Sequence, residues 1–289
     1  MKNRFEYILF VFLSSIFRIL GLNLSRRVSV LIAFLFFYFI PIRKKTTIEN
    51  LSHAFPSYSE DEIKKLAFKC YRSFCITLSE ILVMPFLSEQ EIKNAVYCSN
   101  TNLILEKHKE GKGVVLLSAH YGNWEYIAAS FGLQINTSLS VVVKSQRNPF
   151  VTDWLNKTRT MWTNKAVLLG VSIRQIFKEL KEKNIVAMVA DQRGPSDGIR
   201  VKFFGRPVSV YPGPAMLALK TGAPILYGIA VRQKDYSYKA IMHEISLEDL
   251  TGSNEEKIVE ISQRHTSYLE QIIREHPEQW LWMHKRWKY

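Results

Sequence analysis

The sequence predicts an α/β fold: a mixed central sheet flanked by helices, preceded by an apolar N-terminal membrane anchor. Short apolar runs alternate with stretches of helical periodicity along most of the chain. The N-terminal part is much more apolar than the remainder. A length of 289 residues with 47% hydrophobic content is enough for one large buried core. We therefore expect an anchoring segment at residues 1–45 and one catalytic domain at residues 46–289.

The anchor contains two apolar stretches, Phe5–Leu22 and Val28–Ile42, separated by the basic pair Arg26-Arg27. As a helix the second stretch would reach about 22 Å, which is less than the roughly 30 Å of a hydrocarbon core. Because Arg18 interrupts the first stretch, a re-entrant hairpin or interfacial anchor is as good an interpretation as a full span, and a buried core hairpin is the alternative. Basic residues flank both stretches and favour anionic lipid and a cytoplasmic main domain: Lys2, Arg4, Arg26, Arg27, Arg43, Lys44 and Lys45.

Strands and helices alternate after the anchor. Apolar, β-branched runs predict strands at Gly113–Ser118, Leu139–Val143, Ile185–Ala190, Pro224–Val231 and Tyr238–Ile245. Helical periodicity predicts helices at Glu60–Val83, Trp124–Leu133, Phe150–Trp162, Ser172–Lys183, Gly213–Thr221 and Glu255–Glu275. This order favours an α/β sheet whose strand ends gather the functional residues.

The most informative motif is His120-x4-Glu125, which directly follows the first of these strands. On one continuous helix, residues five apart diverge by roughly 140°, so the two side chains can meet only if the chain turns a corner. Gly122 permits such a corner, and Asn123 can cap the helix that follows. We expect the Glu125 carboxylate to hold the second ring nitrogen of His120, while an ordinary structural histidine beside a helix-terminal acid is the alternative.

The basic composition indicates the charge of the binding partner but not its chemical class. A formal net charge of +13 indicates an anionic partner, which could be nucleic acid, an acidic lipid surface or a phosphorylated substrate. The motifs for nucleotide-binding loops, nucleophile elbows and zinc helices are missing from the sequence, so we expect neither a metal nor a cofactor. The three cysteines have no metal-ligand spacing and suit buried thiols in a reducing compartment.

Four blocks of the sequence resemble the late-acting lipid A acyltransferases, which are lauroyl and myristoyl transferases within the lysophospholipid acyltransferase superfamily. They are the motif His120–Glu125 and the segments 50–56 (NLSHAFP), 201–207 (VKFFGRP) and 277–287 (PEQWLWMHKRW). The resemblance implies a glycerolipid acyltransferase-like fold and acyl transfer at the inner leaflet of a bacterial inner membrane, with the catalytic domain on the cytoplasmic face. It also implies an acyl carrier protein as donor, although coenzyme A is anionic as well.

The chemistry of such a transfer assigns roles to the motif. An acceptor hydroxyl must lose its proton as its oxygen attacks a thioester, and a positioned imidazole can take that proton. His120 is then the general base and Glu125 its orienting acid, with the acceptor's own hydroxyl in place of a catalytic serine and no acyl-enzyme intermediate. By the resemblance, an arginine after the Asn148-Pro149 step stabilises the oxyanion, which points to Arg159; a solvated helix charge is the alternative.

The remaining candidate residues are expected to bind substrate. Asp191, Gln192 and Arg193 follow another strand and should face His120, with Arg193 on a phosphate and Asp191 supporting the loop or contacting a sugar hydroxyl. The alternative for this loop is an ordinary surface turn. Asn123, the basic residues Lys144 and Arg147, and the aromatic residues Phe203 and Phe204 complete the expected substrate contacts, the two phenylalanines as lining of an acyl channel. Aromatic residues at this density are more often simple core, which is the alternative for the two phenylalanines.

Two classes of function remain open at this stage. The first is an acyltransferase whose acceptor is a lipid A precursor or, as the runner-up, a lysophospholipid, an aminolipid or another glycolipid. The second is a non-catalytic basic protein that binds a membrane surface or nucleic acid. The His-x4-Glu corner favours the enzyme, because a binding protein gains nothing from a carboxylate behind a histidine, so we expect no nucleic-acid partner.

Overall fold

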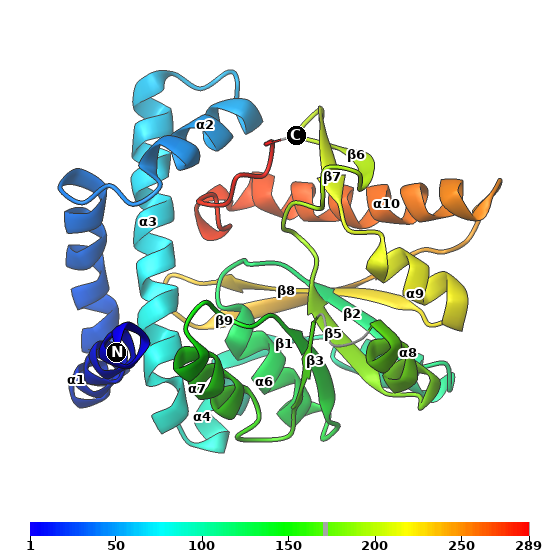
Figure 1. The fold of residues 1–289 in the computed structure, drawn as a ribbon, viewed down its shortest axis with the longest axis horizontal. Coiled ribbons are helices and arrows are strands. Elements are labelled where there is room, and N and C mark those ends of the chain that lie inside the picture. Colours follow the sequence, from blue (N-terminus) through cyan, green and yellow to red (C-terminus); the bar gives the residue numbers. More distant parts are fainter. Residues whose placement is uncertain (170–172, 289) are drawn as a thin grey trace.

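A seven-stranded sheet lies at the centre of the computed structural model, which describes residues 1–169 and 173–288 (Figure 1). Its strand order is β1-β9-β8-β2-β5-β3-β4, and β6 and β7 form a separate antiparallel hairpin. The strands are β1 (Val96–Cys98), β2 (Val114–Ser118), β3 (Leu139–Val143), β4 (Lys165–Leu168), β5 (Ile185–Val189), β6 (Ile199–Phe203), β7 (Arg206–Val210), β8 (Ile225–Arg232) and β9 (Tyr238–Ile245). All neighbours in the sheet are parallel except β8 and β9, so the predicted mixed sheet is confirmed.

The helices cover both faces of this sheet. They are α1 (Lys2–Tyr38), α2 (Lys44–Ala54), α3 (Glu60–Val83), α4 (Glu89–Ala95), α5 (Asn102–Lys109), α6 (Trp124–Gln134), α7 (Pro149–Arg159), α8 (Ile173–Lys181), α9 (Gly213–Thr221) and α10 (Asn254–Glu275). Capping boxes begin α3, α4 and α10, where a serine side chain and a glutamate three residues later satisfy the first free N–H groups. The six predicted helices are therefore present; the expected start at Ser172 lies outside the described residues, and α8 is described from Ile173.

The sheet separates two apolar cores. Along β2, Val115 and Leu117 point into the core beneath α3, α9 and α10, while Val114 and Leu116 point into the core around α4 and α6. Successive strand residues face opposite sides, and β2 is covered on both. This explains why the sequence of β2 is a continuous apolar run and not an alternating one. Burial on both faces also fixes the position of the C-terminal end of β2.

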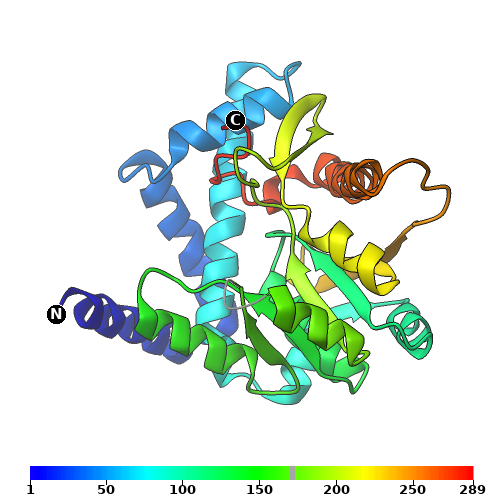
Figure 2. The same cartoon turned by 45° about the vertical axis from the view of Figure 1, so that its right-hand side comes forward.

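The N-terminal helix α1 packs along α3 at one side of the molecule, as both views show (Figures 1 and 2). It bends at Gly21, whose backbone angles of φ 67° and ψ 171° are not helical, so the two predicted apolar stretches become the two parts of one kinked helix. Many of its large apolar side chains are exposed, Phe5 and Ile19 among them, which contradicts the alternative of a buried core hairpin. By length and composition alone, this helix is long and apolar enough to cross a membrane.

The sequence analysis did not predict helices α2, α4 and α5 or strands β1, β4, β6 and β7. Strand β1 has three residues and β4 has four, which is too short for a clear period. The β6–β7 hairpin turns at Phe204 and Gly205, both of which have positive φ. Segment 201–207, which the sequence analysis identified only as a family-like block, forms this turn and parts of both strands.

Candidate active site

The corner between β2 and α6 places the two residues of the His-x4-Glu motif. Gly122 has φ +53°, and a Cβ atom there would lie 2.3 Å from the carbonyl oxygen of Ala230. Only glycine meets both conditions without strain. The Asn123 side chain accepts a hydrogen bond of 3.1 Å from the backbone N–H of Tyr126 and so caps α6. The predicted corner is confirmed.

His120 is held by a carboxylate, and that carboxylate belongs to Asp191. The Nδ1 atom of His120 lies 2.8 Å from Oδ1 of Asp191, and the backbone N–H of His120 donates to Oδ2 at 3.0 Å. Asp191 comes directly after β5, the parallel neighbour of β2, so the two strand ends meet at one edge of the sheet. Of the loop that was expected to face His120, Asp191 does contact it, and this hydrogen bond occupies Nδ1 and leaves Nε2 unused by Asp191.

The electrostatics of this pair favour a charged couple. Burial opposes the charged form of the imidazole, but the Asp191 carboxylate outweighs burial and raises the pKa of His120 above its usual value. Burial likewise opposes ionisation of Asp191, yet His120 and the Trp280 indole N–H lower the pKa of Asp191 to about 2. Asp191 therefore stays ionised at any ordinary pH and can stabilise an imidazolium that forms during proton transfer.

Glu125 has a different partner from the one that the motif suggested. Its two carboxylate oxygens accept hydrogen bonds from Arg159, 2.8 Å from Nε and 2.6 Å from Nη2. Both side chains are mostly buried, and although burial opposes the guanidinium charge, Glu125 raises the pKa of Arg159. The expectation that Glu125 orients the imidazole is thus corrected: Asp191 occupies that position, and Glu125 forms a bidentate ion pair with the arginine that was expected to bind the oxyanion.

The C-terminal segment completes the site. The backbone N–H of Leu281 donates to the carbonyl of His120, and the N–H of Gly122 donates to the carbonyl of Gln279, both at 3.0 Å. From the same segment, the Trp280 indole donates to Oδ2 of Asp191 at 2.9 Å. The sequence analysis placed this tryptophan in a family-like block but did not predict its contact with Asp191. The sequence signal for this contact was the family-like block 277–287, which is rich in aromatic and basic residues and binds the backbone of His120 and Gly122.

Arg286 is a second residue of this segment that the sequence analysis did not place in the site. It is 2% exposed, and its guanidinium donates to the carbonyl of Ser209 at 2.8 Å and to that of Gln192 at 3.3 Å. Burial lowers the pKa of Arg286 to about 10, against the opposing pull of Asp191. The residue thereby ties the loop after β5 to the β6–β7 hairpin and holds that loop under His120.

A cleft opens beside His120. It is lined by three parts of the chain: one face of α3, the corner itself and the C-terminal segment, contributing Ser73, Phe74, Thr77, His120, Gly122, Trp124 and Glu278–Leu281. The Trp124 ring meets the His120 ring edge at a centroid distance of 4.9 Å. The cleft is small, about 10 Å³, and the His120 side chain beside it is 18% exposed.

Three of the expected substrate contacts are corrected because their side chains are buried. Asn123 is 0% exposed and is occupied by its cap and by Glu80, to which it donates at 3.1 Å. Phe203 and Phe204 are 0% and 7% exposed and pack against the C-terminal tryptophans, with Phe203 at 5.5 Å from Trp280. The two phenylalanines are therefore part of the aromatic core and do not line an acyl channel.

The other expected contacts lie around the site with mixed exposure. Lys144 and Arg147 are exposed between β3 and α7, where Arg147 approaches Glu6 of α1 at 3.5 Å. Gln192 accepts from Arg286 through its carbonyl, and Arg193 donates to the carbonyl of Lys285 at 3.3 Å. Both carboxylate oxygens of Asp191 accept hydrogen bonds, and the residue is 3% exposed. Of its two expected roles, contact with a sugar hydroxyl is therefore corrected, and Asp191 instead supports the site by binding His120 and Trp280. Within residues 1–169 and 173–288, no group of three or more metal-ligating side chains is arranged to hold an ion.

A partly exposed imidazole backed by a buried carboxylate, at the carboxyl edge of an α/β sheet, is an arrangement suited to general-base chemistry in an enzyme. The model of the bacterial lipid A biosynthesis acyltransferase family matches residues 2–289. The chain is 27% identical over 259 residues to a lipid A biosynthesis lauroyltransferase of Escherichia coli K12, covering 86% of this chain and 80% of the relative. It is 23% identical over 252 residues to the palmitoleoyltransferase of the same organism, with the same two coverages.

A third relative is named for a different acceptor lipid. The phosphatidylinositol mannoside acyltransferase of Mycobacterium tuberculosis H37Rv is 28% identical over 120 residues, which cover 40% of this chain and 38% of the relative. Since the family model spans almost the whole sequence, the chain belongs to the bacterial lipid A biosynthesis acyltransferase family and is an acyltransferase. A site suited to general-base chemistry is compatible with membership of an acyltransferase family.

Proposed function

We propose that the protein transfers a fatty acyl chain from an acyl thioester to a hydroxyl of a lipid A precursor, with His120 as general base. The observation that carries the proposal is the His120–Asp191 pair, with Nδ1 fixed at 2.8 Å and Nε2 left for the cleft, in a chain of the lipid A acyltransferase family. Asp191, and not Glu125, is the acid that orients the imidazole.

The transfer can run in two steps with no acyl-enzyme. The acceptor O–H bond breaks as its proton passes to Nε2 of His120, and the oxygen forms a bond to the thioester carbonyl carbon. The tetrahedral intermediate then collapses, the C–S bond breaks, and the departing thiolate takes the proton from the imidazolium. Asp191 stabilises the imidazolium between the two steps, and a thiol and an ester are released.

Arg159 is the proposed charge near the reacting carbonyl. The Glu125 carboxylate raises the pKa of His120 and the Arg159 guanidinium lowers it, so both charges act on the proposed base. A fixed pair of this kind is oriented before the substrate binds, which is the condition for stabilising an oxyanion cheaply. The ion pair with Glu125 would hold the arginine in place for that role.

The remaining features support a membrane site and an acidic donor. The exposed apolar side of α1 and the basic residues Arg43, Lys44 and Lys45 beyond its end suit an anionic membrane surface with the catalytic domain on the cytoplasmic side of the inner membrane. The exposed Lys144 and Arg147 suit acyl carrier protein or coenzyme A as donor. The boundary at residue 45 stays a proposal, since α1 is packed along α3.

A second acceptor deserves a test, because one relative is named for acylating phosphatidylinositol mannoside. We therefore propose mass spectrometry of total lipids from cells that overproduce the protein or its His120→Ala variant. The proposal expects a lipid A species with one additional acyl chain in the first cells only. An unchanged lipid A together with a newly acylated lysophospholipid, aminolipid or glycolipid would assign the other acceptor, and no acylated product at all would contradict the proposed reaction.

A further inference from the structure

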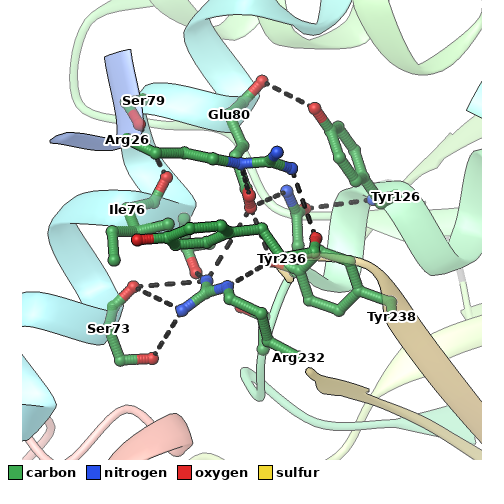
Figure 3. Close-up of polar contacts among 12 residues, drawn as sticks. Arg26, Ser73, Ile76, Ser79, Glu80, Tyr126, Arg232, Tyr236 and Tyr238 are labelled. Carbon is green, nitrogen blue, oxygen red and sulfur yellow. Dashed lines mark hydrogen bonds and ion pairs between the residues drawn. The ribbon is translucent and has the colours of Figure 1, made fainter. Parts of the chain in front are cut away.

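Another buried carboxylate, that of Glu80 on α3, binds side chains from several elements (Figure 3). Arg26 of α1 reaches Oε1 through its Nε at 2.8 Å, and Arg232 at the end of β8 approaches Oε2 at 3.7 Å. The hydroxyl of Tyr238 at the start of β9 also donates to this carboxylate. Two guanidiniums therefore face one carboxylate in a buried place, an arrangement that costs desolvation energy and is weak evidence for a purely stabilising role.

The cluster is connected to the corner through Asn123. This side chain has both of its ends committed: Oδ1 accepts from the N–H of Tyr126, and Nδ2 donates to Oε2 of Glu80 at 3.1 Å. Glu80 thus fixes the orientation of the amide that caps α6, and α6 carries Glu125 in its first turn.

A second connection runs through Thr77, one turn before Glu80 on the same face of α3. Its hydroxyl donates to the carbonyl of Gly122 at 2.7 Å and accepts a hydrogen bond from Arg232. Since the N–H of Gly122 is bonded to Gln279, both backbone polar groups of this glycine are held by other segments. Thr77 therefore fixes the peptide that lies between His120 and Glu125.

We propose that Glu80, Thr77 and Arg26 are positioning residues for the transfer reaction, and that α1 is consequently part of the active-site framework as well as an anchor. The proposal rests on the proposed function, in which His120 is the base. Arg26 inserts from α1 into the cluster, so the docking of this helix on α3 sets the orientation of Glu80 and, through it, of the corner. A shift of about 1 Å at a reacting group can cost roughly 100-fold in rate, which makes such remote support consequential.

The first test compares Thr77→Val with Thr77→Ser. Valine has nearly the shape of threonine but lacks the hydroxyl, whereas serine keeps it. We expect Thr77→Val to lower kcat by about tenfold or more with KM for the thioester within about twofold, and Thr77→Ser to restore most of the loss. The imidazole resonances of His120, measured by NMR on the full-length labelled protein, should move in the valine variant and return in the serine variant.

The second test compares two neighbouring arginines of α1. Arg26→Met leaves Glu80 paired with Arg232, one charge of each sign, while Arg27→Met removes the same charge from an exposed position. We expect Arg26→Met to lower kcat by about tenfold and Arg27→Met to leave it unchanged. Both variants should bind equally to vesicles of anionic phospholipid.

The outcomes distinguish this inference from the proposed function. A kcat within about twofold of the wild type in both Thr77→Val and Arg26→Met, with unmoved His120 resonances, overturns the positioning role. If the wild type transfers no acyl chain to a lipid A precursor but the resonances still move in Thr77→Val, the proposed function fails and the positioning of His120 stands. Equal loss of kcat in Arg26→Met and Arg27→Met would mean that α1 acts only through its overall positive charge, which overturns the positioning role of Arg26.

Discussion

The two residues of the His-x4-Glu motif are neighbours in the sequence, yet they belong to two different ion pairs in the structure. His120 pairs with Asp191, which is 71 positions away, and Glu125 pairs with Arg159, which is 34 positions away. The corner at Gly122 separates the pairs, because it turns the chain between them. A motif of this kind therefore marks a site without specifying which of its members interact.

The two pairs also differ in what they can do. In the first, the titratable group is the imidazole, whose side chain is 18% exposed toward the cleft, while its carboxylate is 3% exposed. In the second, the cation is a guanidinium that does not lose its proton, and both side chains are mostly buried. The first pair is suited to moving a proton and the second to presenting a fixed charge.

The largest expected effect separates the pairs most sharply. His120→Ala removes the base itself and should lower kcat by about 10³-fold or more, since general bases commonly contribute about 10² to 10⁴. A matched control is His108→Ala, because His108 is bonded to the carbonyl of Lys183 near the opposite ends of β2 and β5. Steady-state transfer assays on both variants check this. Near-normal activity of His120→Ala would remove His120 from the mechanism.

A change at the corner should disturb both pairs at once. Gly122→Ala places a Cβ atom 2.3 Å from a carbonyl oxygen at a positive φ, so the backbone must move. We expect about a 100-fold loss of kcat together with a lower unfolding temperature. Gly205→Ala is the control, since that glycine also has positive φ but has open space around its Cβ position. Equal losses of activity in both variants would show that backbone strain alone, and not the corner, matters.

The smallest effect concerns the second pair. Glu125→Gln leaves the Arg159 charge buried without its carboxylate, which should destabilise the fold by about 3 kcal/mol and lower kcat by about tenfold. A double-mutant cycle with Arg159→Gln measures the coupling. Because Glu125 acts through Arg159, the double variant should lose no more activity than Arg159→Gln alone, whereas additive losses would mean that the two residues act separately.

Much of the fold could be predicted because its elements are long and periodic. The bounds of α3 agree with the predicted Glu60–Val83, where a capping box begins the helix, and β3 and β9 also have their predicted bounds. The short strands β1 and β4 could not be predicted, since three or four residues carry no measurable period. The kink at Gly21 was hidden between two apolar stretches whose relation depends on packing against α3.

The candidate site was predictable in its place but not in its partners. Two polar loops after parallel strands indicated that His120 and Asp191 would meet, and they do. Which carboxylate binds Nδ1 depends on the rotation at the corner, and the sequence spacing does not encode that rotation. Both a channel and a core were open for Phe203, because an aromatic side chain has the same sequence signature in either place, and its burial decides for the core.

The central claim is that Asp191, and not Glu125, holds the catalytic imidazole, and the pH dependence of kcat/KM tests it most directly. In the proposed mechanism the neutral imidazole is the base, and Asp191 raises the pKa of His120, so the wild-type acid limb should lie above the usual pKa of histidine. Asp191→Asn should lower the rate by about 100-fold or more and move this limb to lower pH, while Glu125→Gln should move it much less. A larger shift in Glu125→Gln than in Asp191→Asn would contradict the account.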